Sequence, residues 1–220
     1  MLTSSQGAIQ QDPAGSGLRS RKKHKTLLAI QDAALELFAE QGFEKTTVEQ
    51  IAERAEVSNA TFFRYFKAKS DVVFGGESDE RVDWLPALNR AIVERPAAED
   101  DVTAVKHAVL DMWVSLLEPS RVRRQYVAAE TSPLLHGLSS DIAVRWQATI
   151  RDALAERHGL KEPDQRCRVA AAMMLATFSE TVGEWVHTDD GGELAIAIEH
   201  GFALMAELCA GWFAGTTRRR

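Results

Sequence analysis

The chain has 220 residues, a formal net charge of −6 at pH 7, 45% hydrophobic residues and 26% charged residues. These values are typical of a soluble globular protein and exclude a disordered chain. No stretch approaches 18 consecutive apolar residues, so the sequence predicts no membrane span.

Targeting and redox signals point to one compartment. The first 17 residues lack the basic start and apolar core of a signal peptide. Cys167 and Cys209 stand alone in apolar helical patterns, without metal-binding spacing, which indicates buried thiols in a reducing environment. We therefore expect a cytoplasmic protein with no membrane partner.

The charge is distributed unevenly along the chain. Residues 19–75 carry ten Lys or Arg and eight Asp or Glu, whereas residues 76–220 have a net charge of −7. The segment RSRKKHK, residues 19–25, holds five cations and no acid. Such a cluster before a structured domain is either an electrostatic footprint for phosphates or a solvated charged leader. We expect residues 1–24 to form a flexible basic leader. Its expected DNA contacts, including the first residue after it, are Arg21, Lys22, Lys23 and Lys25.

The first predicted helix starts near Thr26, which is a candidate N-cap. Apolar positions between Ile30 and Phe38 recur at three- and four-residue spacing, which indicates one face of an amphipathic helix. Gly42 follows the last apolar position, and glycine commonly ends a helix because it adopts a left-handed backbone.

Two shorter helices are predicted next. Thr47 is a good N-cap for a second helix that runs to about Arg54, and Ser58 is a good N-cap for a third. The four residues AEVS separate the two, and Val57 is the apolar residue placed to fill the gap between them. A longer helix followed by two short helices and a tight turn is the helix-turn-helix arrangement.

Helical patterns continue to the end of the chain, separated by Gly and Pro. The longest covers about residues 139–157. The last two, at about residues 164–187 and 193–213, are apolar over much of their circumference. Each is therefore expected to bury one side within the subunit and another against a second copy. With no period-two run to indicate a strand, the sequence predicts an all-α fold and a homodimer formed through the last two helices.

Residues 26–73, TLLAIQDAALELFAEQGFEKTTVEQIAERAEVSNATFFRYFKAKSDVV, resemble the N-terminal domain of TetR-type transcriptional regulators. The match runs in register and without gaps. It implies a helix-turn-helix DNA-binding domain at residues 25–68 and a helical ligand-binding and dimerisation domain at residues 69–220. It also implies a repressor that leaves a palindromic DNA operator when a small hydrophobic or acyl-type effector binds.

Phosphate contacts position such a protein on a duplex. Thr47 begins the second helix, where a hydroxyl, free amides and the helix dipole all favour an anion. Thr61 and Tyr65 lie four residues apart on the third helix, so both hydroxyls are expected to reach one DNA strand. Lys69 is expected to add its charge at the start of the next helix.

Base reading is expected from the start of the third helix. The resemblance places the readers at Asn59, Ala60 and Phe63. Asparagine pairs with adenine, and alanine and phenylalanine contact thymine methyl groups. Arg64 is placed to reach a guanine or a phosphate. The expected DNA-facing set in this segment is Ser58, Asn59, Ala60, Thr61, Phe63, Arg64 and Tyr65.

The aromatic residues of this helix divide into two groups. Phe62 and Phe66 are expected to face inward and hold the third helix against the first. Phe63 either meets a thymine methyl group or is a third core aromatic. Two departures from the family pattern stand out: Glu56 replaces a common glycine in the turn, and Phe63 and Tyr65 replace a common Tyr and His.

The segment FFRYFKAKSDVVFGGESDE, with ERP after the next helix, also resembles the mycofactocin-system regulators, a branch linked to acyl-CoA-type effectors. A sensing domain needs an apolar cavity with a few polar groups. Met and aromatic side chains at helical spacing are the candidates for its wall, and the alternative is that they are ordinary core residues. RVRR at residues 121–124 either binds a phosphate-bearing ligand or forms a solvated surface. The expected ligand contacts are Met112, Trp113, Tyr126, Trp146, Met174 and Phe178. Further candidates are Met173 and Trp185, with Arg124, Glu130 or Glu180 as polar anchors.

Other function classes find little support in the sequence. No nucleophile elbow, Gly-rich phosphate loop, paired-histidine motif or Cys/His constellation indicates an enzyme or a cofactor. His107 and Asp111 lie one helical turn apart, but two ligands do not make a metal site. A constitutive architectural DNA-binder is the other alternative, and the Met- and Trp-rich C-terminal half counts against it.

Overall fold

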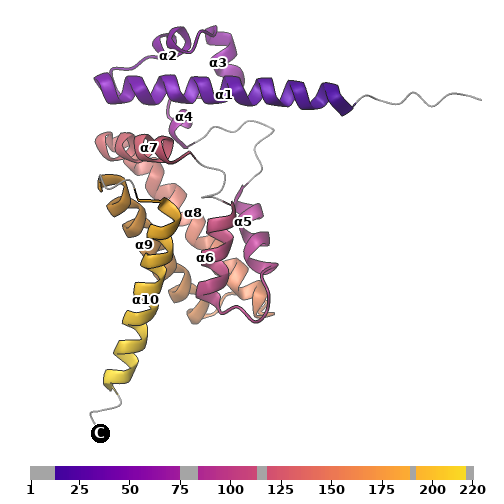
Figure 1. Cartoon of the computed structure of the whole chain (residues 1–220), viewed down its shortest axis with the longest axis vertical. Helices are drawn as coiled ribbons and strands as arrows, with labels where there is room; N and C mark the ends of the chain where they lie inside the picture. The colour runs from indigo at the N-terminus through magenta and orange to yellow at the C-terminus, as the bar shows by residue number, and fades with distance from the viewer. Residues whose placement is uncertain (1–12, 75–83, 113–117, 189–191, 217–220) are drawn as a thin grey trace, which may run out of the picture.

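The computed structural model describes residues 13–74, 84–112, 118–188 and 192–216, and within these ranges the chain is helical and contains no strand (Figure 1). The expected all-α fold is therefore confirmed. The helices are α1 (Pro13–Gln41), α2 (Val48–Arg54), α3 (Asn59–Tyr65), α4 (Asp71–Phe74), α5 (Trp84–Val93), α6 (Asp101–Met112), α7 (Pro119–Thr131), α8 (Pro133–Arg157), α9 (Gln165–His187) and α10 (Leu194–Thr216).

Helix α1 lies between the short N-terminal helices and the C-terminal helices. In Figure 1, α2 and α3 lie on one side of it, and α7 with the remaining C-terminal helices lies on the other. Its first turns extend beyond the body of the molecule. It ends at Gly42, which has a φ of 85°, and the Gly42 N–H donates to the Phe38 carbonyl at 3.0 Å.

The start of α1 differs from the sequence-based expectation. Thr26 does not cap the helix but lies inside it, with its Oγ1 donating to the Lys22 carbonyl at 3.1 Å. Residues 13–24, expected to be a flexible leader, are helical from Pro13 onward. Arg, Lys and Leu are good helix formers and make up six of the eight residues 18–25, so the charge cluster continues the helix rather than preceding it.

The N-terminal helices bury one cluster of side chains. Ile30, Ala34 and Leu35 from α1 pack with Ile51 of α2, and the aromatic residues of α3 pack against them. Two residues from the C-terminal half, Ala128 of α7 and Leu135 of α8, belong to the same cluster. The N-terminal helices and the start of the C-terminal half therefore share a hydrophobic core.

Helix α8 begins six residues earlier than the expected start near residue 139. Ser132 is its N-cap and accepts a hydrogen bond from the Leu135 N–H at 3.4 Å, and Pro133 follows at the first helical position. Proline is favoured there because that N–H has no partner within the helix. Pro133 therefore begins α8, two residues after α7 ends.

The C-terminal helices enclose a second cluster, to which each helix from α5 to α10 contributes buried side chains. Gly201 of α10 lies so close to α9 that a Cβ there would stand 2.0 Å from the Thr181 Oγ1. Cys167 is buried in this cluster and Cys209 is half-buried. Among the helices of the described ranges, none is long and apolar enough to cross a membrane.

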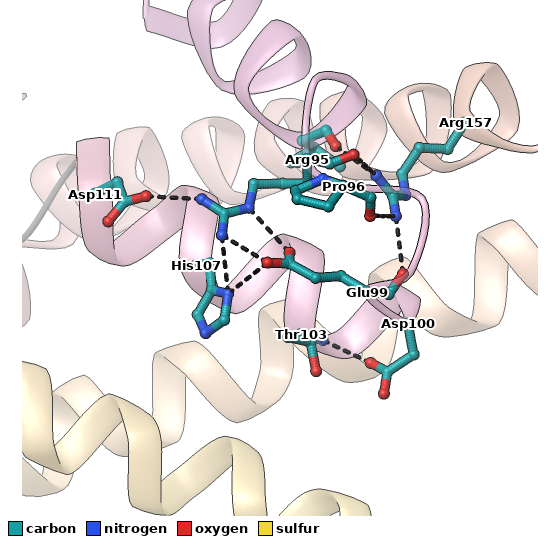
Figure 2. Close-up of polar contacts among 9 residues, drawn as sticks. Arg95, Pro96, Glu99, Asp100, Thr103, His107, Asp111 and Arg157 are labelled. Carbon is teal, nitrogen blue, oxygen red and sulfur yellow. Dashed lines mark hydrogen bonds and ion pairs between the residues drawn. The ribbon is translucent and has the colours of Figure 1, made fainter.

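A charged network fixes the turn between α5 and α6 (Figure 2). Arg95 makes two hydrogen bonds to Glu99, at 2.7 and 2.9 Å, and a third to Asp111 at 2.9 Å. His107 Nδ1 lies 3.1 Å from both Arg95 and Glu99. His107 and Asp111 are thus partners of Arg95, and no group of metal ligands is present in the part of the chain that the structure describes.

Candidate nucleic-acid interface and effector domain

Helix α2 starts at a fully formed capping box. The Thr47 Oγ1 accepts from the Gln50 N–H at 3.2 Å, and the Thr47 N–H donates to the Gln50 Oε1 at 2.9 Å. This arrangement satisfies two N–H groups at the helix start. Hydrogen bonds from the Glu49 backbone N–H and, second, from the Thr47 side chain lower the pKa of Glu49. The Thr47 hydroxyl thus has a carboxylate partner within the protein, and its expected phosphate contact stays a prediction.

The turn between α2 and α3 places a glutamate in a left-handed backbone. Glu56 has a φ of 54°, and its N–H donates to Glu53 at 3.1 Å. The next N–H, of Val57, donates to the Ala52 carbonyl at 2.9 Å. This pair of hydrogen bonds is a Schellman motif, whose left-handed position is usually glycine. The turn therefore forms with the expected geometry despite the unfavourable residue.

Helix α3 is capped by Ser58, as the sequence predicts. Its Oγ accepts from the Thr61 N–H at 3.1 Å and lies 3.0 Å from the Thr61 Oγ1. The two hydroxyls therefore share one hydrogen bond at the start of α3. Thr61 is half-buried, whereas Asn59 and Ala60 are exposed.

The side chains of α3 divide into a buried face and an exposed face. Phe62 and Phe66 are buried, which confirms the expected inward pair, and their ring centroids lie 5.7 Å apart. Phe63 is 54% exposed and stands edge-on to Phe62. It is therefore not a third core aromatic. Arg64 is also exposed.

Tyr65 departs from its expected place on the DNA-facing surface. It is only 5% exposed, and its ring belongs to the N-terminal core. The residue lies three positions after Phe62, which puts it on the buried face of the helix. A spacing of four places Tyr65 near Thr61 on the helix, but it does not show whether the two side chains face DNA or the core.

Lys69 also departs from expectation, because its ammonium group points into the protein. Its Nζ donates to the carbonyls of Phe43 at 2.5 Å and Thr46 at 2.7 Å. It also lies 4.1 Å from the centre of the Phe43 ring. Burial lowers the pKa of Lys69, and the Glu44 carboxylate opposes that shift.

The basic cluster lies along the first half of α1. Arg21, Lys22 and Lys25 are exposed, and Lys23 is half-buried. Because this segment is helical, these cations project from a rod rather than from a flexible arm. Their contact with DNA stays a prediction.

The arginines of residues 121–124 are half-buried and bound to other groups of the protein, which contradicts the expected solvated surface, whereas the expected phosphate-bearing ligand stays a prediction. Arg121 makes three hydrogen bonds of 2.9–3.1 Å to Asp32 of α1, and Arg124 adds one at 3.0 Å. Arg123 lies 3.9 Å from the centre of the Trp185 ring and donates to two carbonyls at the end of α9. This segment docks α7 onto α1 and α9.

Four of the predicted ligand contacts lie in the core formed by the C-terminal helices. Trp146 and Phe178 are stacked with centroids 5.5 Å apart, and Met174 is buried in the same cluster. The Tyr126 hydroxyl donates to the Ser179 carbonyl at 3.4 Å, and burial raises the pKa of Tyr126. These residues are packed against one another, as the core interpretation predicts.

The remaining candidates are spread over the domain. Met112 is half-buried and borders the same core, while Trp113 lies outside the described residues. Met173 is 38% exposed. Two hollows of about 410 and 340 Å³ lie between α5 and α8, and none of the predicted ligand contacts lines them.

Several polar residues that join the two halves were not among the predicted site residues. The Ser132 hydroxyl donates to the Glu44 carboxylate at 2.7 Å, which lowers the pKa of Glu44. Within the N-terminal helices, Gln31 is buried in α1 and donates to the Val72 carbonyl of α4. Ser132 directly precedes a proline, and this helix-start signal was available in the sequence. The partners of Asp32 and Gln31 lie 41 or more residues away and have no local signal.

Comparison with known proteins gives the chain its family. The family model "Bacterial regulatory proteins, tetR family" matches residues 30–74, and the model "MftR C-terminal domain" matches residues 99–210. The transcriptional regulator TcmR of Streptomyces glaucescens is 32% identical over 91% of this chain and 92% of its own length.

Two further relatives extend the likeness. The putative mycofactocin biosynthesis regulator MftR of Mycobacterium tuberculosis is 28% identical over 77% of this chain and 84% of its own. The crystal structure of Bacillus subtilis FadR in complex with stearoyl-CoA superimposes with a TM-score of 0.56 at 23% identity, covering 81% of this chain and 96% of that one. The chain is thus a transcriptional regulator of the TetR family, with a C-terminal domain of the MftR type.

Proposed function

We propose that this regulator is a repressor that acts in the cytoplasm and binds a palindromic operator as a homodimer. One observation carries the proposal: α3 exposes Asn59, Ala60, Phe63 and Arg64 above a buried aromatic base. Amide, methyl, aromatic and guanidinium groups are those that read base edges in the major groove. Thr47 and the cations of α1 supply phosphate contacts on the same unit.

The proposed dimer forms through α9 and α10. Both helices expose large apolar side chains although each also packs within the subunit, and such patches mark protein interfaces. A two-fold dimer presents two copies of α3, so the spacing between half-sites follows from the distance between them. The exposed residues are Val169, Met173, Ile196, Leu204 and Leu208.

The proposed effector is a hydrophobic ligand of the acyl-CoA class. The likeness to a fatty acyl-CoA complex supports this class, as does the apolar cluster of Tyr126, Trp146, Met174 and Phe178. A ligand that enters this cluster must separate the stacked rings. Because α7 carries both Tyr126 and the arginines bound to Asp32, movement there reaches α1. The ligand releases DNA only if it binds the released conformation better.

The test begins with selection of binding sites from random duplex DNA, followed by titration with stearoyl-CoA, lauroyl-CoA and free coenzyme A. We expect a palindrome, steep salt dependence and release by an acyl-CoA but not by coenzyme A alone. Asn59→Ala and Phe63→Ala should change the preferred base. Failure to enrich any sequence would contradict the regulator, whereas a palindrome unaffected by every acyl-CoA would contradict only the effector class.

A further inference from the structure

The turn between α1 and α2 is held from inside the domain by Lys69. Two of the three donors of its ammonium group bind the Phe43 and Thr46 carbonyls, at 2.5 and 2.7 Å. The Phe43 ring covers the charge at 4.1 Å. The Thr46 carbonyl immediately precedes Thr47, the N-cap of α2. The position of Lys69 therefore fixes where α2 begins.

The same turn is attached to the C-terminal domain. Glu44 lies between the two carbonyls that Lys69 binds, and its carboxylate accepts a hydrogen bond of 2.7 Å from Ser132. Ser132 is fully buried and caps α8, so its hydroxyl accepts from the Leu135 N–H while donating to Glu44. Lys69 and Glu44 also attract each other electrostatically. One chain of contacts thus connects the start of α8 with the start of α2.

We propose that Lys69 is a positioning residue rather than a phosphate contact, and that Lys69, Glu44 and Ser132 form a latch that holds α2 for DNA binding. This inference rests on the proposed DNA-binding function. The latch makes the geometry of the DNA-binding unit depend on the turn between α7 and α8. Movement of that turn in the C-terminal domain releases Glu44 and thereby loosens the start of α2.

Salt dependence distinguishes a positioning lysine from a phosphate contact. Each phosphate contact contributes about −0.9 to the slope of log K against log salt concentration, because binding releases counterions. Lys69→Met should weaken operator binding by about tenfold, the equivalent of one charged hydrogen bond, with the slope unchanged. Lys25→Met, an exposed cation on α1, should flatten the slope by about 0.9. A flattened slope for Lys69→Met would overturn the latch.

Two substitutions away from Lys69 test the latch without altering the lysine. Glu44→Ala removes a negative charge, so electrostatics alone predicts tighter DNA binding, whereas loss of the latch predicts weaker binding. Glu53→Ala, an exposed carboxylate on α2, is the matched control and should bind at least as tightly as the wild type. Ser132→Ala should weaken binding with an unchanged slope. If Glu44→Ala binds as tightly as Glu53→Ala, the latch is wrong.

The outcomes separate the latch from the function on which it rests. Unfolded chains must not be mistaken for weak binding. Circular dichroism melting of each variant measures its stability, and titration of protein into operator DNA held well above the Kd measures the fraction of chains that can bind. A wild-type protein that selects no DNA sequence would end both proposals. A wild-type protein that binds an operator, together with a Lys69→Met slope lowered like that of Lys25→Met, would leave the regulator standing and refute the latch.

Discussion

Glu56 occupies a left-handed backbone position that is usually glycine. A non-glycine residue in the left-handed region costs about 1 kcal/mol of stability. Glycine removes that strain, but its greater freedom in the unfolded chain cancels part of the gain. Glu56→Gly should therefore raise the free energy of unfolding by up to about 1 kcal/mol and also strengthen DNA binding by removing a negative charge. Glu56→Gln removes the charge but keeps the strain. Urea denaturation and operator titration should show both gains for glycine and only the second for glutamine. Equal stability of the two variants would contradict this account.

Phe63 and Tyr65 are neighbouring aromatics with opposite environments, 54% and 5% exposed. Tyr65→Ala should cost about 3–5 kcal/mol of stability, the loss typical of truncating a buried aromatic side chain. Phe63→Ala should leave the unfolding midpoint nearly unchanged but alter base preference. Each variant serves as the control for the other in paired denaturation and site-selection experiments. A stable Tyr65→Ala variant with altered base preference would return Tyr65 to the DNA surface.

At the scale of single residues, the sequence predicted a role correctly where its cause lies in neighbouring residues. Thr47, Ser58 and Gly42 act on residues within four positions, so their roles could be predicted from order alone. Lys69 could not be placed, because its acceptors are main-chain carbonyls 23 and 26 residues away. Its position at the start of the next helix favoured a phosphate contact, and nothing in the local sequence pointed to the Phe43 ring.

At the scale of elements, the turn between α5 and α6 depends on the charge of Glu99. Hydrogen bonds from Arg95, and secondarily from His107, lower the pKa of Glu99 from 4.5 to about 2. A lowered pKa means that Glu99 stabilises the fold fully above about pH 4.5 and loses this effect as the pH falls towards 2. Glu99→Gln should therefore be less stable than the wild type at pH 6, and the difference should shrink at pH 2.5.

The control for Glu99 is removal of its main partner. In an Arg95→Met background the further change Glu99→Gln should have a smaller pH-dependent effect, because the main interaction that lowers the pKa of Glu99 is already absent. Thermal unfolding of the four proteins at both pH values completes the cycle. A difference between wild type and Glu99→Gln that is the same at pH 6 and pH 2.5 would show that Arg95 does not control this carboxylate.

The helices themselves were predicted more accurately than their ends. The last two were located closely, since Asp164 and the TDDGG segment delimit them, whereas α1 starts 13 residues before the expected Thr26. Charged residues carry no apolar periodicity, so in the sequence a cationic helical segment resembles a leader. Periodicity also could not separate a cavity wall from a core: Trp146 and Phe178 satisfy both patterns, and the structure stacks them.

At the scale of the whole molecule, dimerisation should control operator binding. Leu204→Glu with Leu208→Glu places two charges on the exposed apolar face of α10 and should produce a monomer. Leu134→Glu, at an equally exposed leucine outside that face, is the control and should remain dimeric. Light scattering coupled to gel filtration measures the mass, and operator titration should show that the monomer loses the advantage of a palindrome over a half-site. A dimeric double variant would place the interface elsewhere.

The shared core of the N-terminal helices limits how this regulator can be recombined. Ala128 and Leu135 fill space in the N-terminal core where α7 packs against α1 and α4, although they are encoded more than fifty residues after the helix-turn-helix segment ends. A chimera that transplants residues 1–74 onto a foreign sensor would leave that space open to water. A functional chimera should therefore need α7 and the start of α8 from the same regulator as the DNA-binding helices. The exchangeable module is then made of two segments that are separate in sequence.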